Sequence, residues 1–434
     1  MTPASTPVVR SVVPRNQCYD PRSPGPPDGA SVTFRRWPYP YRAMVAICSD
    51  LDETPDGAVY WETMRFLNTT EVTSIGPGVG LEVGNSIYFD MPPEQFAYWN
   101  TDDAGRAMIR ALLRSGHVDC LHSFGDLATT RRHAARALED LTRHDCRPTV
   151  WIDHATAPTN FGDDIMRGRG DLRGDEAYHA DLTCAFGIRY VWRGRVTSVV
   201  GQDVRRSLRT ISRLRHPVAS AMTILKERAK GFLAQRGSVK YAMHGPNRLL
   251  RKAKLRDGRL VWEFMRVNPH WGGVSRGDTA DGLAEVLTDS MLRSLVQREG
   301  VAVLYTHLGK VHRHDEPLGP ATRQALRRLA WWRRDGSILV TTTRRALDYR
   351  RLTQTLDVSA VETSDELHVR VTTHEGTTDP ARELAGLTLY VPERIRVRLN
   401  VDGHDVPTLE QNGPDGTGRP SVSIPWAPLE FPRL

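Results

Sequence analysis

The sequence predicts an α/β barrel of seven or eight parallel strands, followed by a C-terminal antiparallel β-sandwich. Between residues 41 and 350, short apolar runs alternate with amphipathic helical patterns. Most of these runs are apolar throughout, as expected for parallel strands that are covered on both faces. After residue 350, polar and apolar residues alternate instead, which is typical of an antiparallel sheet with one face in solvent.

The pattern divides the 434 residues into three parts. Residues 1–40 form a Pro-rich extension, residues 41–350 form the barrel with a basic helical insert at about 194–260, and residues 351–434 form the sandwich. We find no apolar run of about 18 residues and no signal-like apolar stretch at the N-terminus. The five scattered cysteines contain no CxxC pair, so we expect a reducing, cytoplasmic location.

Seven strands are expected within the barrel, and four more within the sandwich. The barrel strands are Arg42–Cys48, Asn85–Phe89, His117–Leu121, Pro148–Ile152, Ile188–Trp192, Val301–Tyr305 and Ile338–Thr342. The sandwich strands are Glu366–Thr372, Gly386–Val391, Ile395–Val401 and Ser421–Ile424.

Three helices are predicted between the strands from their apolar spacing and capping residues. Thr101 is placed to cap a helix that ends at Gly116, and a second helix spans about Thr130 to His144. A third carries apolar residues from Leu283 to Leu295.

The net charge of +8 comes from one segment of the chain. Arg193 to Arg266 holds 19 Lys and Arg against 4 Asp and Glu, whereas the other residues hold 40 against 47. Apolar residues recur at helical spacing from Arg205 to Arg259, which predicts cationic helices that lie on an anionic membrane surface. A solvated insertion packed on the barrel explains the pattern equally well. No recognised nucleic-acid motif accompanies the charge, so we expect no nucleic-acid partner.

Polar side chains of catalytic type follow four of the predicted strands. They are Asp50 and Asp52, His122 and Asp126, His154, and His307. Because α/β barrels place their active sites at the carboxyl ends of the strands, we expect these side chains to converge. An Asp after a strand can equally cap the next helix. Carboxylate and imidazole ligands suit zinc or another divalent first-row ion.

These residues resemble the motifs of the NodB-like polysaccharide deacetylases, which are metal-dependent carbohydrate esterases with a distorted (β/α) barrel. Cys48-Ser49-Asp50-Leu51-Asp52 resembles their acidic first motif, and His122-Ser123-Phe124-Gly125-Asp126 resembles their H-S/T-x-x-H motif, with Asp in place of the second His. Arg147-Pro148 and Val303-Leu304-Tyr305-Thr306-His307 are similar to the third and last motifs. The order of the motifs agrees, and the resemblance covers roughly residues 40–345.

The resemblance implies that Asp52 and His122 bind the metal and that Asp126 is the third ligand. With a carboxylate in place of an imidazole, zinc is still expected first, with iron, manganese or cobalt as alternatives. His154 and His179 are rival third ligands. Asp126 can also be read as a helix cap, and the site would then lack a ligand.

The resemblance also implies an acid–base pair. Asp50 would be the general base, oriented by Arg147, and His307 would be the general acid that protonates the leaving group. A neighbouring Arg would keep Asp50 ionised in a buried site.

Three residues are candidates for binding the substrate. His154 follows a strand and is a metal ligand or a substrate contact, whereas Trp151 and Trp271 offer aromatic faces on which sugars stack. For Trp151, packing in the core is an equally good interpretation.

We therefore expect a metal-dependent hydrolase that removes an acyl group from an amino sugar of a polysaccharide or a lipid-linked glycan. A catalytically inactive glycan-binding or assembly protein on the same scaffold is the main alternative. A glycosidase that uses its carboxylates directly, without a metal, is a third.

Overall fold

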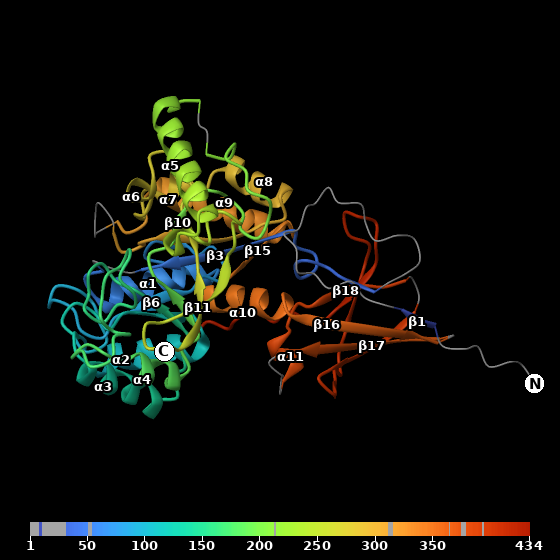
Figure 1. Cartoon of the computed structure of the whole chain (residues 1–434), viewed down its shortest axis with the longest axis horizontal. Coiled ribbons are helices and arrows are strands. Elements are labelled where there is room, and N and C mark those ends of the chain that lie inside the picture. The colour runs from blue at the N-terminus through green and yellow to red at the C-terminus, as the bar shows by residue number, and fades with distance from the viewer. Residues whose placement is uncertain are drawn as a thin grey trace, which may run out of the picture. The chain divides into compact units, whose positions relative to one another are not determined.

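The structure is a computed structural model that describes residues 8–10, 32–50, 54–211, 214–310, 316–363, 365–374, 379–392 and 395–434 (Figure 1). It divides the chain into two compact units. The larger unit comprises Met44–Ala346 and Leu429–Leu434, and the smaller comprises Met1–Ala43 and Leu347–Pro428.

The larger unit is built around an 11-stranded sheet that curls into a half-barrel (Figure 1). Its order is β10-β13-β14-β3-β6-β7-β8-β9-β12-β11, and β15 also pairs with β3. Each pair along this order from β10 to β12 is parallel, whereas β11 pairs antiparallel with β12. The strands are β3 (Ala43–Ser49), β6 (Asn85–Ile87), β7 (Val118–His122), β8 (Val150–Ile152), β9 (Tyr190–Trp192), β10 (Val196–Thr197), β11 (Leu250–Lys254), β12 (Leu260–Phe264), β13 (Arg266–Val267), β14 (Val301–Thr306) and β15 (Ile338–Thr341).

The apolar runs predicted the central strands of this sheet correctly. All seven expected barrel strands form, and their bounds differ from the expected ones by no more than two residues. Every residue of β3 is buried, because both faces of this strand are covered. The parallel arrangement brings the carboxyl ends of β3, β7 and β14 to one edge of the sheet.

The basic segment is only partly helical. Besides helix α5 (Pro217–Gln235) and the single turn η1 (Val239–Tyr241), it contributes β10, β11 and β12 to the sheet. Strands β11 and β12 form a hairpin whose turn contains Asp257-Gly258, with a positive φ of 99° at the glycine. An Asp-Gly pair between alternating runs is a strong hairpin signal, and it was available in the sequence.

Helices cover the curled sheet, and their ends follow local capping rules. Asp102, rather than Thr101, caps α2 by accepting a hydrogen bond from the Gly105 amide, and Gly116 ends this helix with a φ of 83°. The second predicted helix forms as α3, and Thr130 caps it. The expected third helix forms as two helices, because the chain breaks at Thr288, which caps the second of them.

The remaining helices have the following bounds. They are α1 (Gly57–Asn68), α2 (Asp103–Ser115), α3 (Arg131–Arg143), α4 (Ala180–Phe186), α6 (Val274–Gly277), α7 (Leu283–Val286), α8 (Asp289–Gln297), α9 (Pro320–Arg334), α10 (Thr343–Thr353) and α11 (Pro380–Glu383). A short hairpin joins β4 (Val72–Thr73) to β5 (Gly76–Pro77). Within the described ranges, we find no helix with the length and apolar content needed to cross a membrane.

The smaller unit has two sheets around one hydrophobic core, as the sandwich prediction requires. The first has the order β1-β16-β17-β19-β20 and the second has the order β2-β18-β22-β21. The strands are β1 (Val8–Arg10), β2 (Thr33–Phe34), β16 (Leu356–Glu362), β17 (Glu366–Thr373), β18 (Thr388–Tyr390), β19 (Arg396–Val401), β20 (His404–Asp405), β21 (Glu410–Asn412) and β22 (Ser421–Ser423). Strands β1 and β2 come from the Pro-rich N-terminal segment, of which residues 1–7 and 11–31 lie outside the described ranges.

The sandwich is not wholly antiparallel, which corrects the prediction. Strands β17 and β19 pair in parallel. The chain between them leaves the first sheet, forms α11 and β18 in the second sheet, and then returns. Such a crossover is what a parallel pair requires, and alternation along a single strand does not reveal it.

A buried carboxylate fastens one end of the larger sheet. Glu263 on β12 is fully buried and lies 3.0 Å from Nε of Arg193 and 3.2 Å from Nε of Arg195, and it also binds Arg251 of β11. Burial alone would raise the pKa of Glu263, but these three guanidinium groups hold it below its usual range. Arg195 also pairs with Asp164 at 2.7 Å, so Arg193 and Arg251 are the cations whose printed ion pairs depend on Glu263.

We expect Glu263→Gln to lower the free energy of unfolding by about 3–5 kcal/mol, because the change leaves buried guanidinium groups without their counter-charge. Urea unfolding of the full chain measures this. The matched control is Glu139→Gln, which breaks the exposed ion pair with Arg143 and should change stability by less than about 1 kcal/mol. Equal effects of the two changes would contradict this account of the sheet edge.

Candidate functional site

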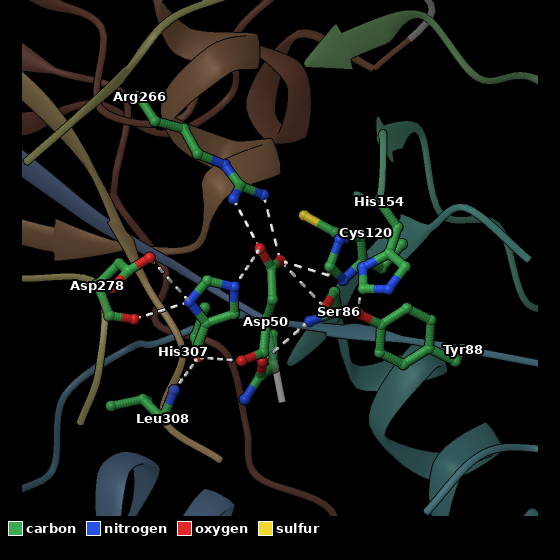
Figure 2. A network of polar contacts seen from close by, with 12 residues as sticks. Asp50, Ser86, Tyr88, Cys120, His154, Arg266, Asp278, His307 and Leu308 are labelled. Carbon is green, nitrogen blue, oxygen red and sulfur yellow. Dashed lines mark hydrogen bonds and ion pairs between the residues drawn. The ribbon is translucent and has the colours of Figure 1, made fainter. Parts of the chain in front are cut away.

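A buried carboxylate at the end of β3 is the centre of the candidate site (Figure 2). Arg266 of β13 donates two hydrogen bonds to Asp50, from Nη1 to Oδ2 at 2.8 Å and from Nη2 to Oδ1 at 3.2 Å. Two imidazoles flank the same carboxylate. His122 Nδ1 lies 3.6 Å from Oδ1, and His307 Nε2 lies 3.9 Å from Oδ2. Ser86 Oγ also donates to Oδ1 at 3.3 Å.

Main-chain pairing places these side chains together. Asp50 follows β3 directly, and its amide continues the strand pairing by donating to the Thr306 carbonyl of β14 at 3.1 Å. His307 is the next residue after β14, and the neighbouring amide of Leu308 donates to Ser49 Oγ at 3.0 Å. The ends of two adjacent parallel strands thus fix the carboxylate and one imidazole.

Asp50 is held in its ionised form. Its residue is only 1% exposed, and burial alone would raise its pKa. The charge of Arg266, with smaller contributions from His122 and His307, outweighs burial and lowers the pKa of Asp50 below its usual value of 3.8. The guanidinium group of Arg266 is itself stacked over Trp192, 4.1 Å from the ring centroid, and its pKa is raised by Asp50 despite its complete burial.

The hydrogen bonds of His307 orient its ring. Its Nδ1 lies 2.7 Å from the main-chain carbonyl of Asp278. Because a carbonyl oxygen only accepts hydrogen bonds, Nδ1 carries a hydrogen atom. Nε2 then faces Asp50, so the proton that this ring gains or releases is on the side of the carboxylate.

A second polar group lies beside His122. Tyr88, which follows β6, stacks on the His122 ring with the centroids 4.6 Å apart, and its hydroxyl lies 3.0 Å from His154 Nδ1. His154 Nε2 in turn lies 3.2 Å from Asp126 Oδ1. The structure therefore brings His122, His154 and Asp126 to one place, as their positions after strands predicted.

Arg147 does not occupy the position expected for it, and Arg266 does. Arg147 precedes β8 and lies at an exposed position, where its Nε is 3.6 Å from Asp145 Oδ1 and its guanidinium stacks over Phe186. The amino end of a parallel strand is at the opposite edge of the sheet from the site. The role of orienting Asp50 thus falls to a residue that is 216 positions away in the chain.

Two of the remaining candidates are core residues. Trp151 is fully buried, donates to Asp153 Oδ1 at 2.7 Å and packs against Phe161. His179 is also buried, with Nδ1 2.7 Å from Thr183 Oγ1 and Nε2 2.8 Å from the Thr159 carbonyl. Burial lowers the pKa of His179 to about 4. Neither side chain is available as a substrate contact or a metal ligand in this arrangement.

Trp271 lies in a different environment. Its Nε1 donates to Glu285 Oε2 at 2.8 Å, and its ring stacks face to face on His216, with the centroids 3.5 Å apart. Its carbonyl accepts a hydrogen bond from Thr223 of α5. The described contacts of Trp271 are therefore with residues in and beside α5, α6 and α7 rather than with Asp50.

The expected metal site is not assembled from the described residues. Asp52 lies outside them. His122, Asp126 and His154 supply donors of the right chemical type for a first-row metal, but His154 is engaged by Tyr88 and Asp126. Across the described ranges, which omit 51–53 and 311–315, no group of three or more His, Cys, Asp or Glu is arranged to hold a metal ion.

Sequence reasoning missed Arg266, Tyr88 and Asp278. Arg266 carried a signal that could have been used, because it is a charge within the otherwise apolar run Phe264-Met265-Arg266-Val267. A charged residue in a buried strand requires a partner. Its partner, however, is set by long-range pairing of strands, which spacing in the sequence does not reveal. Tyr88 and Asp278 carried no comparable signal.

Asp50 makes the stability of the fold depend on pH, and we expect Arg266→Met to reverse the direction of this dependence. In the wild-type chain, the lowered pKa of Asp50 contributes stability above about pH 4, which is lost as the pH falls. Without Arg266, burial dominates and raises the pKa of Asp50, so stability is lost as the pH rises above about 4. We also expect a loss of about 3–5 kcal/mol near neutral pH.

Urea unfolding of the full chain at several pH values measures both effects, with the exposed Arg147→Met as the matched control. A parallel pH dependence in wild type and Arg266→Met would contradict the role assigned to Arg266.

Comparison with known proteins gives this chain no relative. No family model, no curated protein and no solved structure matches it.

Proposed function

We propose that this protein is a hydrolase that removes an acyl group, such as acetyl, from an amino sugar of a polysaccharide or glycoconjugate precursor. The observation that carries the proposal is the ionised, buried carboxylate of Asp50, bound by Arg266 and flanked by His122 and His307 at the ends of three parallel strands. Groups whose protonation is controlled in this way are typical of sites of acid–base chemistry.

Acid–base hydrolysis of an amide uses these residues in two steps. Asp50 accepts a proton from the water that attacks the acyl carbon. His307, in its protonated form, donates the hydrogen on Nε2 to the departing nitrogen. Arg266 keeps Asp50 ionised before the water attacks, and the Asp278 carbonyl keeps the His307 ring turned toward the carboxylate. Asp50 holds the proton taken from water while the amine leaves, and its return to solvent, with reprotonation of His307, restores the starting state.

The class of substrate rests on the sequence motifs. Their order resembles that of the NodB-like deacetylases, and the curled parallel sheet is compatible with the distorted barrel that this resemblance implies. The structure supports the proposal by gathering Asp50, His122 and His307, which are three of the residues that the motifs single out.

A divalent metal belongs to this proposal as a prediction. Asp52 and His122, with Asp126 or His154, would hold it, and it would polarise the acyl carbonyl and activate water.

One observation favours a second function. Asp50, His122 and His307 are each less than 5% exposed, as in a purely structural charge network. A catalytically inactive glycan-binding or assembly protein on the same scaffold would preserve such a network for stability alone. Turnover separates the two candidates.

We expect Asp50→Asn and His307→Gln each to lower the rate of acetate release from an N-acetylated amino-sugar oligosaccharide by about 10²- to 10⁴-fold. The change at His307 removes the proton donor and leaves the Asp50–Arg266 pair intact, so it also tests the mechanism if Asp50→Asn fails to fold. The exposed His368→Gln is the control. Binding of the oligosaccharide without acetate release by the wild type would favour the inactive alternative.

We expect the purified wild-type protein to contain about one equivalent of a divalent metal and His122→Ala to contain little or none. Elemental analysis after purification and after reconstitution with zinc, iron, manganese and cobalt measures this, again with His368→Gln as the control. Equal metal content in all three proteins would contradict the predicted role of His122.

A further inference from the structure

Helix α5 presents most of its large apolar side chains to solvent, whereas the residues that it buries are polar or small. Val218, Met222, Leu225 and Phe232 are 77%, 52%, 61% and 51% exposed. Their spacing of four, three and seven residues places them on one face of the helix. The buried residues of the same helix are Ser220, Thr223, Glu227 and Gly231. By contrast, α2 buries Met108, Ile109, Leu112 and Leu113, as a helix on a protein surface ordinarily does.

The apolar surface is concentrated in this region. Seven of the thirteen exposed large hydrophobic side chains of the described residues lie between positions 214 and 239. They are Leu214, Val218, Met222, Leu225, Phe232, Leu233 and Val239. In Figure 1, α5 projects at one extremity of the larger unit. Isolated apolar residues on a surface are ordinary, but a continuous stripe along one helix indicates a binding surface.

Specific contacts fix the orientation of α5. Glu227 Oε1 lies 2.8 Å from Lys230 Nζ, and Oε2 accepts a hydrogen bond from Thr197 Oγ1 of β10 at 2.9 Å. Burial would raise the pKa of Glu227, but its hydrogen-bonded and cationic neighbours, led by His244 and Lys230, lower it to about 2. Rotation of the helix to bury its apolar face would expose this network, so the outward apolar face is a stable feature of the fold.

The buried face also fits closely at a second point. Arg206 lies so close to Gly231 that a Cβ atom there would be 2.0 Å from Nη1. Thr223 donates to the Trp271 carbonyl at 2.9 Å. The fully buried positions of α5 are therefore occupied by polar or small residues.

Basic side chains border the apolar stripe. Lys226 and Arg228 are both exposed, and at 100° per residue they project on opposite flanks of the line from Val218 to Leu225. Arg215 and Arg236 are exposed at the two ends of the helix. The surrounding segment carries the excess of 19 cationic over 4 anionic residues. An apolar stripe flanked by Lys and Arg is the arrangement of a helix that lies in the interface of an anionic bilayer.

We propose that α5 binds the surface of a bilayer that contains anionic phospholipid, with Val218, Met222, Leu225 and Phe232 inserted among the acyl chains. Lys226 and Arg228 would bind the phosphate groups. The charge of the stripe's borders favours this partner over a second copy of the chain, because two like-charged helices repel each other. The proposal does not depend on the hydrolase activity, since membrane binding is measured without substrate.

The test is sedimentation of the full-length protein with vesicles of pure phosphatidylcholine or of phosphatidylcholine mixed equally with phosphatidylglycerol. We expect binding to the mixed vesicles that weakens with added salt. The double change Val218→Ser and Leu225→Ser should weaken it by on the order of tenfold or more. Lys226→Gln and Arg228→Gln should each weaken it by about fivefold.

The matched control is Val72→Ser, because Val72 on β4 is also 77% exposed but lies outside the basic segment. All the changed side chains are exposed, and thermal unfolding checks that each variant is folded. Equal binding by the wild type and the Val218/Leu225 variant would overturn the proposal. A second result would also overturn it: the wild type does not bind the mixed vesicles but forms a dimer, and the Val218/Leu225 variant is a monomer. This result would show that a second copy of the chain covers the apolar stripe.

Discussion

The pairing of Asp50 with Arg266 is the interaction on which the candidate site depends. A carboxylate buried to this degree would ordinarily be neutral, and a neutral Asp50 would neither accept a proton from water nor attract the flanking imidazoles of His122 and His307. The bidentate contact with Arg266 reverses that tendency and joins the end of β3 to β13 across 216 residues of sequence.

Buried carboxylates paired with cations also occur away from the candidate site. Glu263 and Glu227 are also buried carboxylates kept ionised by cations. Glu263 joins β12 to β11 through Arg251, and Glu227 joins α5 to β10 through Thr197. Several Arg residues of the basic segment therefore serve as internal counter-charge.

The parts of the fold that depend on local pattern could be predicted from the sequence. The seven central strands are visible in the sequence as apolar runs, because strands that are covered on both faces have no polar side. The helix ends near Thr130 and Gly116 are visible because these residues have the chemistry of helix caps. The strand ends also identified Asp50, His122 and His307, because parallel strands bring their carboxyl ends to one edge. Pairing between distant segments was beyond such reasoning. Nothing in the spacing assigns Arg266 rather than Arg147 to Asp50, or shows that β17 and β19 run parallel. The bounds of β10 and β13 are too short for any periodicity to be visible.

The basic segment shows how composition can mislead when it is read without structure. A high local charge reads as a solvated face, yet Arg193, Arg195 and Arg266 are buried and paired with carboxylates of the sheet. Of the two interpretations of the apolar residues of α5, packing of these residues on the barrel is wrong, because they lie on the outer face of the helix. Glu227 sets which face of α5 is buried. Its side chain binds Lys230, Thr197 and the Ser198 amide, and these contacts leave the apolar face in solvent. A single acidic residue within a cationic amphipathic stretch was therefore more informative than the many basic ones around it.

The two units are interleaved along the chain, and this affects how they can be made or separated. Strand β2 is near the start of the sequence and pairs with β18, some 350 residues later, and the larger unit lies between them as an insertion. The last residues then return to that insertion, where the Leu429 amide donates to Glu82 and Phe431 packs on Trp61. During synthesis, β2 therefore cannot pair with β18 until nearly the whole chain has been made. No single cut liberates either unit intact, so expression of one alone calls for a circularly permuted or spliced gene rather than a truncation.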